Sequence, residues 1–478
     1  MSRSPLALSV LRYSGLGGSL LLALASVAVR HRLTALPLWF AGTVVLAGAW
    51  LLLGRRLAGV PLRWLLLTGV LWALPVLLCP PLESKDVYAY ACQGSLVNAG
   101  IDPYTHGVSA LPCPWLAQIS PMWRPTPSPY GPLWLLISGG AASTGSLTAA
   151  VWVFRLVALV GIGLVGWAGH RVAVALGADP VRAAWFVLLS PLVLIHAVSG
   201  AHNDALMAGL MMAALAVAMP GALPGERYPQ RALGSGALIG LALAVKATSL
   251  VLLPFAVLLL VRDRRWWPIL RTGLLATVGG AISYGALWAL SGYGFGWVNA
   301  LRNSTPLIVE STSIPTGIGL VAAHGLKLAG RPDVGAGVIA LVRTVGLALL
   351  AAAVTGLWLW AWRRPEPRRV MLATALAVTA EILFGPVVFP WYAVSALAVL
   401  GYGLVDDRIR YRLGFLVAPA ALLILPSGNG LAAIYRRQGG VLDLLLVLAA
   451  LGYGLWYLRR RRSARRSAAP EPEPASRS

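Results

Sequence analysis

Acidic residues are scarce in this chain. Its 478 residues include 16 Asp and Glu against 39 Lys and Arg, and only 12% of the residues are charged. Soluble domains carry about twice that share of charge. Hydrophobic residues make up 58% of the chain, and its mean hydropathy is +0.75. The shortage of charge therefore excludes an ordinary soluble domain.

Cysteine is also sparse, and its spacing excludes a common type of metal site. The three cysteines are Cys79, Cys92 and Cys113. They form no CxxC pair, so a structural zinc site of that type is not predicted. Two alternatives remain: Cys92 and Cys113 pair if their loop faces an oxidising compartment, or all three are free thiols.

Long apolar runs, by contrast, recur from end to end. Runs of about 17–25 residues cross a bilayer core as helices, and a chain in lipid must satisfy its own backbone polar groups. The sequence therefore predicts an all-α, polytopic transmembrane helical bundle with about 13–14 spans, and the first run is interpreted as a span rather than a cleaved signal peptide. The expected spans are residues 9–29, 33–53, 64–80, 148–170, 183–198, 204–219, 233–246, 248–261, 272–290, 336–361, 370–388, 391–404, 413–426 and 440–457.

The net charge of +23 has a distribution that argues against nucleic-acid binding. Arginines cluster in short connections between apolar runs, which is typical of cytoplasmic loops of membrane proteins. Both termini are then cytoplasmic, and the long connections 81–147 and 291–335 are extracytoplasmic. The clusters lie at residues 54–56, 261–265, 363–369, 406–412 and 459–466.

These connections divide the chain into expected parts. Residues 1–457 form one integral-membrane domain, and 458–478 form a basic, disordered cytoplasmic tail. The connection 81–147 is rich in Trp, Tyr and Pro, as in "PWLAQISPMWRPTPSPYGPLW". That composition is poor for disorder, so we expect this first large loop to be folded.

Two carboxylates stand at the start of this loop, in "LESKDVYAYACQGSLVNAGIDPY". Ionisable groups at membrane depth are functional candidates by default. Asp86 follows an outward span, where it could act as a general base that takes a proton from an acceptor hydroxyl during glycosyl transfer from a lipid-linked sugar. The alternative is that Asp86 caps the helix that follows it. Glu83 is a second candidate.

Other candidate residues could bind a substrate. His202, Asn203 and Asp204 lie between two spans, where capping a helix is the alternative role. Lys246 lies in an apolar stretch, where its amine either pairs with a phosphate or snorkels to the interface. Aromatic residues, including Trp123, could form walls for a sugar or lipid. The remaining candidates for substrate binding are Tyr88, Asp102, Tyr104, Arg124, Tyr130, Arg302 and Trp391.

Five stretches in order resemble one known family. They are "SKDVYAYACQGSLVNAGIDPY", "WRPTPSPYGPLW", "SGAHNDALMAGLMMAAL", "VKATSLVLLPF" and "FPWYAVSALAV". They resemble actinobacterial polyprenol-phosphomannose-dependent α-1,6-mannosyltransferases, most closely the B-type enzymes of lipomannan and lipoarabinomannan core synthesis.

The resemblance implies a GT-C glycosyltransferase of the cell membrane. It implies a catalytic acid at Asp86, a polyprenyl-phosphate mannose donor, a mannan-type lipoglycan acceptor, an extracytoplasmic active site and no metal or other cofactor. Three features depart from the pattern. Lys85 precedes Asp86 where the class often has a second acid, Phe389 precedes "PWY" where a His is expected, and three spans precede the reactive loop.

Two other classes of function compete with the transferase. A transporter or lipid flippase is expected to show inverted repeats, and the sequence has no evident repeat. A non-catalytic scaffold gives no reason for the aromatic loop. The transferase hypothesis predicts that Asp86 lines a cavity together with residues of 291–335 or 196–204.

Overall fold

The computed structural model describes residues 5–223, 228–261 and 264–467. Within these ranges the regular elements are helices, with one isolated β-bridge between Ile424 and Gly430. The all-α prediction is confirmed. The helices before and within the first long connection are α1 (Pro5–Val27), α2 (Arg32–Gly54), α3 (Leu62–Leu78), α4 (Asp86–Asn98) and α5 (Pro132–Ala142).

The rest of the chain forms the main bundle and a second long connection. The bundle helices that precede this connection are α6 (Leu147–Leu176), α7 (Pro180–Leu188), the π-helix η5 (Val193–Ser199), α8 (Asp204–Ala218), α9 (Tyr228–Leu243), η6 (Ala247–Leu252), α10 (Leu253–Val261) and α11 (Trp266–Ser291). The later helices are α12 (Gly296–Ser304), η7 (Thr305–Leu307), α13 (Ile314–Leu328), α14 (Gly335–Trp362), α15 (Pro367–Phe384), η9 (Pro390–Tyr392), α16 (Ala393–Gly403), α17 (Asp407–Ala420), α18 (Leu431–Ile434) and α19 (Arg436–Ser467).

Each of the expected spans contains a helix, but many of these helices are short. Among the described residues, five helices are long and apolar enough to cross a membrane, or six if α7 and η5, which meet at a bend of 65°, count as one span. The expected count of about 13–14 spans therefore exceeds the number of full-length apolar helices. One of the shorter ones, the 15-residue α8, is almost wholly buried in protein, which is where a membrane tolerates short or broken helices.

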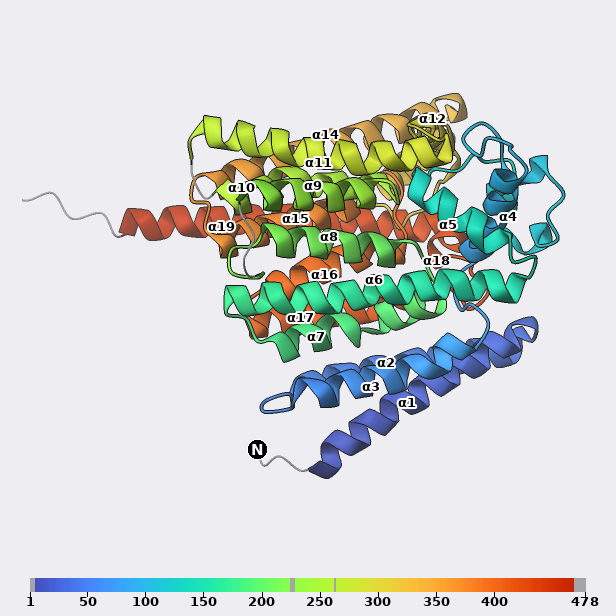
Figure 1. The fold of residues 1–478 in the computed structure, drawn as a ribbon, viewed down its shortest axis with the longest axis horizontal. Coiled ribbons are helices and arrows are strands. Elements are labelled where there is room, and N and C mark those ends of the chain that lie inside the picture. The colour runs from blue at the N-terminus through green and yellow to red at the C-terminus, as the bar shows by residue number, and fades with distance from the viewer. Residues whose placement is uncertain (1–4, 224–227, 262–263, 468–478) are drawn as a thin grey trace, which may run out of the picture.

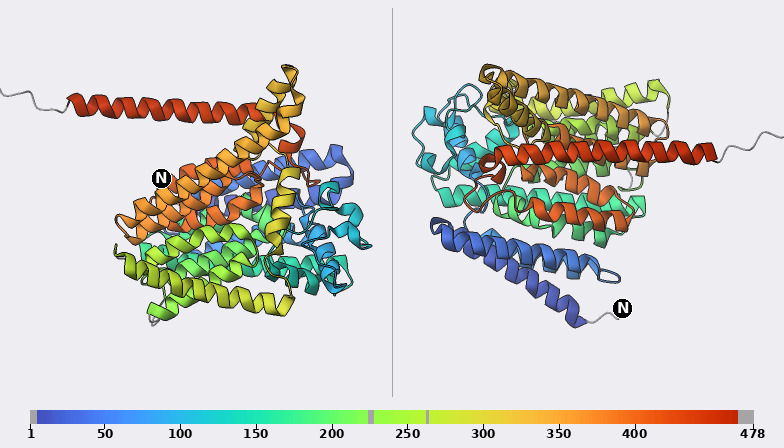
Figure 2. Two further views of the ribbon diagram at one scale, coloured as in Figure 1. Left: turned by 90° about the horizontal axis from the view of Figure 1, so that it is seen from above. Right: turned by 180° about the vertical axis from the view of Figure 1, so that it is seen from behind.

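The long helices run side by side, and the helices of the two long connections lie at one end of the bundle (Figure 1). Helices α4, α5 and α12 lie at one end, and the N-terminus and the end of α19 lie at the other, as a second view confirms (Figure 2). Helices α1–α3 pack along one side. The connections between α2 and α3, α14 and α15, and α16 and α17 lie at the same end of the bundle as the N-terminus, and they carry or adjoin arginine clusters.

The first long connection is folded, as predicted. Cys92 of α4 forms a disulfide with Cys113, which decides between the two alternatives left by the sequence, and Cys79 is free and buried. Gly94 lets α4 approach α5 closely, because a Cβ there would lie 1.9 Å from the carbonyl oxygen of Ser138. The disulfide and the close packing of α4 against α5 therefore hold the chain between these two helices in place.

The basic segment after residue 457 is partly helical. Helix α19 continues to Ser467, so residues 458–467, which the sequence assigned to a disordered tail, extend that helix. Arg and Ala are strong helix formers, which accounts for the continuation. Residues 468–478 of the expected tail lie outside the described residues.

Candidate active site

Asp86 is the first residue of α4, and its side chain does not cap that helix. The N-cap is Lys85, which makes no side-chain cap hydrogen bond. Asp86 Oδ2 instead lies 3.4 Å from Nδ1 of His202, and the Asp86 side chain keeps 16% of its surface exposed. The carboxylate thus contacts one buried side chain and is open on another side, as a group that receives a proton must be.

His202 reaches Asp86 from a sharp turn between η5 and α8. Ala201 has a left-handed backbone (φ 49°) that reverses the chain there. The His202 side chain is 1% exposed and stacks on Trp391, with ring centroids 3.9 Å apart, and Trp391 stacks on Phe389 as well. The stack fixes the imidazole of His202. Because this imidazole contacts Asp86, His202 helps to position the Asp86 carboxylate.

Lys246 supplies the positive charge of the site. It lies in extended backbone (φ −157°, ψ 138°) at the break between α9 and η6. Its Nζ forms an ion pair of 2.8 Å with Asp204 Oδ1 and lies 3.6 Å from the ring centroid of Tyr392. Asp204 is itself 1% exposed in the first turn of α8. The amine therefore points into the protein and is held there, rather than snorkelling to an interface.

Asp86 and Lys246 line one cavity with a volume of about 180 Å³. Its aromatic lining includes Tyr130 and Trp391, and its far wall comes from the second long connection. The expectation that Asp86 shares a cavity with residues of 291–335 is therefore confirmed. The full lining is Asp86, Trp123, Pro129, Tyr130, Lys246, Ala247, Thr248, Leu301, Ser304, Thr305, Ile308, Pro386, Val387, Phe389, Trp391 and Tyr392.

Backbone hydrogen bonds explain why the first loop and the Lys246 segment meet. The N–H of Gly131 donates to the carbonyl of Val245, and the N–H of Leu133 donates to Ala244 at 2.9 Å. The start of α5 is thereby joined to the residues just before Lys246. Tyr130 and Lys246 consequently line the same cavity, although they are far apart in the sequence.

Several predicted site residues lie outside this cavity. Glu83 is fully buried behind the loop, where Trp39 Nε1–H donates to Glu83 Oε1 at 2.6 Å and His196 Nε2 lies 3.8 Å from Oε2. Burial raises the pKa of Glu83 well above its usual range, although the bond from Trp39 opposes this. A buried carboxyl with this environment is suited to hold the loop against α2, not to contact a substrate.

The other residues outside the cavity make local contacts. Asp102 accepts a hydrogen bond from the N–H of Tyr104, and Tyr104 packs edge-on against Tyr293. Arg124 donates to the carbonyls of Ile119 and Ala117. Tyr88 and Arg302 are absent from the lining, and Arg302 is exposed on α12. Asn203 is buried at the turn beside His202 but is likewise absent from the lining.

Arg343 is a residue of the site region that the sequence reasoning missed. It lies in α14, and its guanidinium donates to Thr316 Oγ1 at 2.9 Å and to the carbonyls of Thr305 and Ile308. Thr316 in turn donates to the carbonyl of Pro386 at 2.6 Å. Two stretches of the cavity wall, 304–308 and 386–387, are thus tied together through α13 and α14. An arginine inside the long apolar run 336–361 was the available signal.

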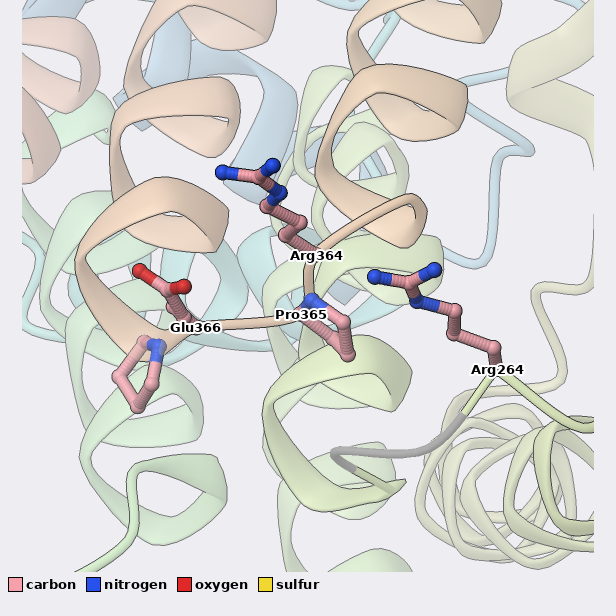
Figure 3. A pocket seen from close by; sticks show the side chains of 5 residues that line it. Arg264, Arg364, Pro365 and Glu366 are labelled. Atoms are coloured by element: carbon pink, nitrogen blue, oxygen red, sulfur yellow. The ribbon is translucent and has the colours of Figure 1, made fainter.

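Two further cavities lie elsewhere. One, of about 440 Å³, is formed by the adjoining connections at the arginine-bearing end, where Arg264, Arg364 and Glu366 lie together (Figure 3). The other, of about 890 Å³, is an apolar groove between α3, α6 and α7. Neither contains the Asp86 and Lys246 pair. Among the described residues, no group of three or more His, Cys, Asp or Glu side chains could hold a metal.

Family models decide what kind of protein has this site. Residues 10–262 match the model described as "Alpha-(1->6)-mannopyranosyltransferase, N-terminal domain", and residues 315–452 match the "MptB C-terminal domain". The chain belongs to the α-(1→6)-mannopyranosyltransferase family. It is therefore a membrane mannosyltransferase, and the family predicted from its motifs is confirmed.

Curated relatives of this mannosyltransferase agree. Alpha-(1->6)-mannopyranosyltransferase A of Mycobacterium tuberculosis is 35% identical over 77% of this chain and 70% of its own length. Alpha-(1->6)-mannopyranosyltransferase B of Corynebacterium glutamicum is 30% identical over 85% of this chain and 70% of its own. Among solved structures, ArnT from Cupriavidus metallidurans bound to undecaprenyl phosphate is similar with a TM-score of 0.41 and 18% identity, over 83% of this chain and 73% of that one.

Proposed function

We propose that this mannosyltransferase moves mannose from polyprenyl-phosphate mannose to a mannan-type lipoglycan acceptor, with inversion and with Asp86 as general base. The observation that carries the proposal is that Asp86 and Lys246 line one cavity of about 180 Å³. A carboxylate and an ammonium group are the two charges that a sugar phosphate donor and a hydroxyl acceptor require on opposite sides of the anomeric carbon.

Asp86 acts on the acceptor. The acceptor hydroxyl oxygen attacks the anomeric carbon of the donor as the bond from that carbon to the phosphate oxygen breaks. The bonding electrons leave with the phosphate, and the hydroxyl proton passes to Asp86. Because the base lies on the face opposite the leaving group, the configuration inverts. His202, 3.4 Å away and stacked on Trp391, keeps the carboxylate aimed at the cavity.

Lys246 acts on the donor phosphate. A pre-positioned cation in a site shielded from water stabilises the charge that develops on a leaving group without reorganisation. The contact of Lys246 with Asp204 and the ring of Tyr392 fixes its amine. A monophosphate leaving group needs few such partners, so no step of the proposal passes through a metal ion.

The proposed active site faces the extracytoplasmic side of the plasma membrane. The long connections that build the cavity and the arginine-bearing connections lie at opposite ends of the bundle (Figure 1). Because Lys and Arg mark the cytoplasmic side, this separation supports an outward-facing site. A polyprenyl chain would remain in the bilayer while its sugar phosphate enters the cavity.

Donor specificity tests the proposal. The purified full-length protein in lipid nanodiscs is given radiolabelled mannose as polyprenyl-phosphate mannose or as GDP-mannose, with an α-1,6-mannan oligosaccharide acceptor. The proposal predicts transfer from the polyprenyl donor alone, with an α-linked product from a β-linked donor. Transfer from GDP-mannose, or a product with the donor's configuration, would refute it.

A further inference from the structure

A second, smaller cavity adjoins the main cavity at Asp86. It has a volume of about 20 Å³ and shares Asp86, Trp123, Pro129 and Tyr130 with the main cavity. We call it the α4 crevice. Its remaining lining residues are Ala89, Tyr90, Gln93, Thr126 and Pro127. Lys246 is absent from it, so the two cavities differ in charge and meet at the proposed base.

The sequence of α4 creates one wall of the crevice. Asp86, Ala89, Tyr90 and Gln93 are spaced three, four and seven residues apart, so they share one face of the helix. Gln93, two turns along α4 from Asp86, lines the same crevice.

The opposite wall is fixed by local bonds. Thr126 Oγ1 donates to the carbonyl of Met122 at 2.6 Å, and the N–H of Ser128 donates to the carbonyl of Pro103 at 2.8 Å. The disulfide at Cys92, the residue before Gln93, ties the same loop to α4. The crevice is therefore a built feature, not an accidental gap in a loose segment.

The side chain of Gln93 indicates that the crevice binds a ligand. Its side chain is 7% exposed, and its Oε1 has no hydrogen-bond partner. A buried polar atom without a partner costs about 1–3 kcal/mol, so an amide oxygen left in this state beside a cavity is expected to gain a partner when the cavity is filled.

The size of the crevice limits which chemical group can enter it. A water-sized group needs about 10–15 Å³ of such space, so the α4 crevice admits one or two heavy atoms and excludes a sugar ring. A primary hydroxymethyl arm, which projects beyond the ring of a hexose, has that size. A secondary hydroxyl on the ring cannot reach Asp86 by this route without the ring entering too.

We infer that the α4 crevice is the acceptor subsite for the hydroxymethyl arm of the terminal hexose, and that Gln93 determines the use of a primary hydroxyl. In the bound acceptor the hydroxyl of the arm donates to Gln93 Oε1, which holds the hydroxyl oxygen in the crevice. As that oxygen attacks the anomeric carbon, the proton passes to Asp86. The donor occupies the main cavity beside Lys246. The inference rests on the proposed function, because it assigns the acceptor side of that same reaction.

The test uses variants of the full-length enzyme in nanodiscs. Gln93→Leu keeps the side-chain size but removes the acceptor atom, and we expect the KM for the mannan acceptor to rise about 3- to 10-fold with an unchanged KM for the donor. Gln93→Ala widens the crevice and should yield products that are not 1,6-linked, detected by methylation analysis. Gln118→Leu and Gln118→Ala, at an exposed glutamine of the same loop, are the matched controls.

A wild-type measurement covers the case in which the variants fail to fold. An acceptor with an extra methyl group on C6 should be a poor substrate, whereas the same methyl group on the oxygen at C2 should be tolerated. If wild-type transfer from polyprenyl-phosphate mannose occurs but the folded Gln93 variants keep their acceptor KM and linkage, or the C6-methyl acceptor reacts normally, the crevice assignment is overturned alone. Absence of wild-type transfer from that donor would instead overturn the proposed function.

Discussion

Two acidic side chains in this mannosyltransferase have different partners. Asp204 is buried and forms an ion pair with Lys246, whereas the partly exposed Asp86 contacts the buried His202. Breaking a buried pair is costly, because the remaining charge has no partner. Lys246 is therefore best tested together with Asp204, so that no buried charge is left without a partner.

Lys246 can be tested with a paired substitution. We expect Lys246→Met combined with Asp204→Asn to lower transfer about 100-fold, because the donor phosphate loses its cation. Thermal melting of the purified protein should shift less than for Lys246→Met alone, which leaves Asp204 unpaired. Steady-state transfer with polyprenyl-phosphate mannose is the measurement. Near-normal transfer by the folded double variant would remove Lys246 from the mechanism.

The buried carboxyl of Glu83 is expected to make the stability of the protein depend on pH. Burial raises the pKa of this carboxyl well above its usual range, and the groups that face it are Trp39 of α2 and His196 of η5. Between the unfolded and the folded pKa the folded state binds more protons, so the free energy of unfolding falls as pH rises. Glu83→Gln, whose amide oxygen can still accept the Trp39 bond, should remove that slope.

Melting temperatures measured from about pH 5 to pH 8 provide the test. The stability gain of Glu83→Gln over wild type should grow with pH. Glu366→Gln, at an exposed glutamate, is the control and should keep the wild-type slope. Parallel curves for wild type and Glu83→Gln would contradict this account of the buried carboxyl.

At the scale of elements, the cavity wall depends on how breaks in the helices are tied together. Arg343 of α14 joins η7 to α13 by three hydrogen bonds, and Thr316 extends the connection to Pro386. A lysine cannot reproduce the planar fork of a guanidinium. The arginine therefore positions the wall of the cavity without lining it.

Arg343→Lys should lower transfer about 10-fold, mainly through a higher donor KM, because two of the wall contacts are lost. Arg331→Lys, at an exposed arginine of the second long connection, should behave as wild type. Kinetics at varied donor concentration separate the two. An unchanged donor KM together with a lowered melting temperature would show that Arg343 only stabilises the fold.

The sequence predicted the helices well and their breaks poorly. Apolar runs identify spans because lipid excludes unsatisfied backbone groups. The extended backbone at Lys246 and the π-helix η5 depend on tertiary contacts, such as the bond from Gly131 to Val245. No local pattern encodes those contacts. Several expected spans are consequently short helices enclosed by others.

At the scale of the whole molecule, the candidate site was predictable only in part. Asp86, Tyr130, Lys246 and Trp391 do line one cavity. Arg124 does not, because its guanidinium bonds to carbonyls of its own loop. Composition and motifs predict which residue types could bind a substrate. They do not predict whether a side chain such as that of Arg124 contacts the substrate or a nearby backbone carbonyl, because this depends on the folded structure.

The orientation of the chain in the membrane can be tested by labelling single cysteines. Cysteine substituted for Thr105, an exposed residue in the first loop, should react with a membrane-impermeant maleimide in intact cells. Cysteine substituted for Arg364, which lies in an arginine-bearing connection, should react only after the cells are opened. The reverse pattern would place the cavity on the cytoplasmic side and contradict the proposed orientation.

The most direct test of the central claim is single-turnover transfer of mannose by Asp86→Asn. The substituted amide keeps the size of the side chain but cannot accept the acceptor's proton. We predict that the variant inserts, folds and binds donor normally but loses transfer by at least about 100-fold, whereas Asp333→Asn, at an exposed aspartate, retains full activity. Transfer by Asp86→Asn at the wild-type rate would contradict the assignment of Asp86 as the base.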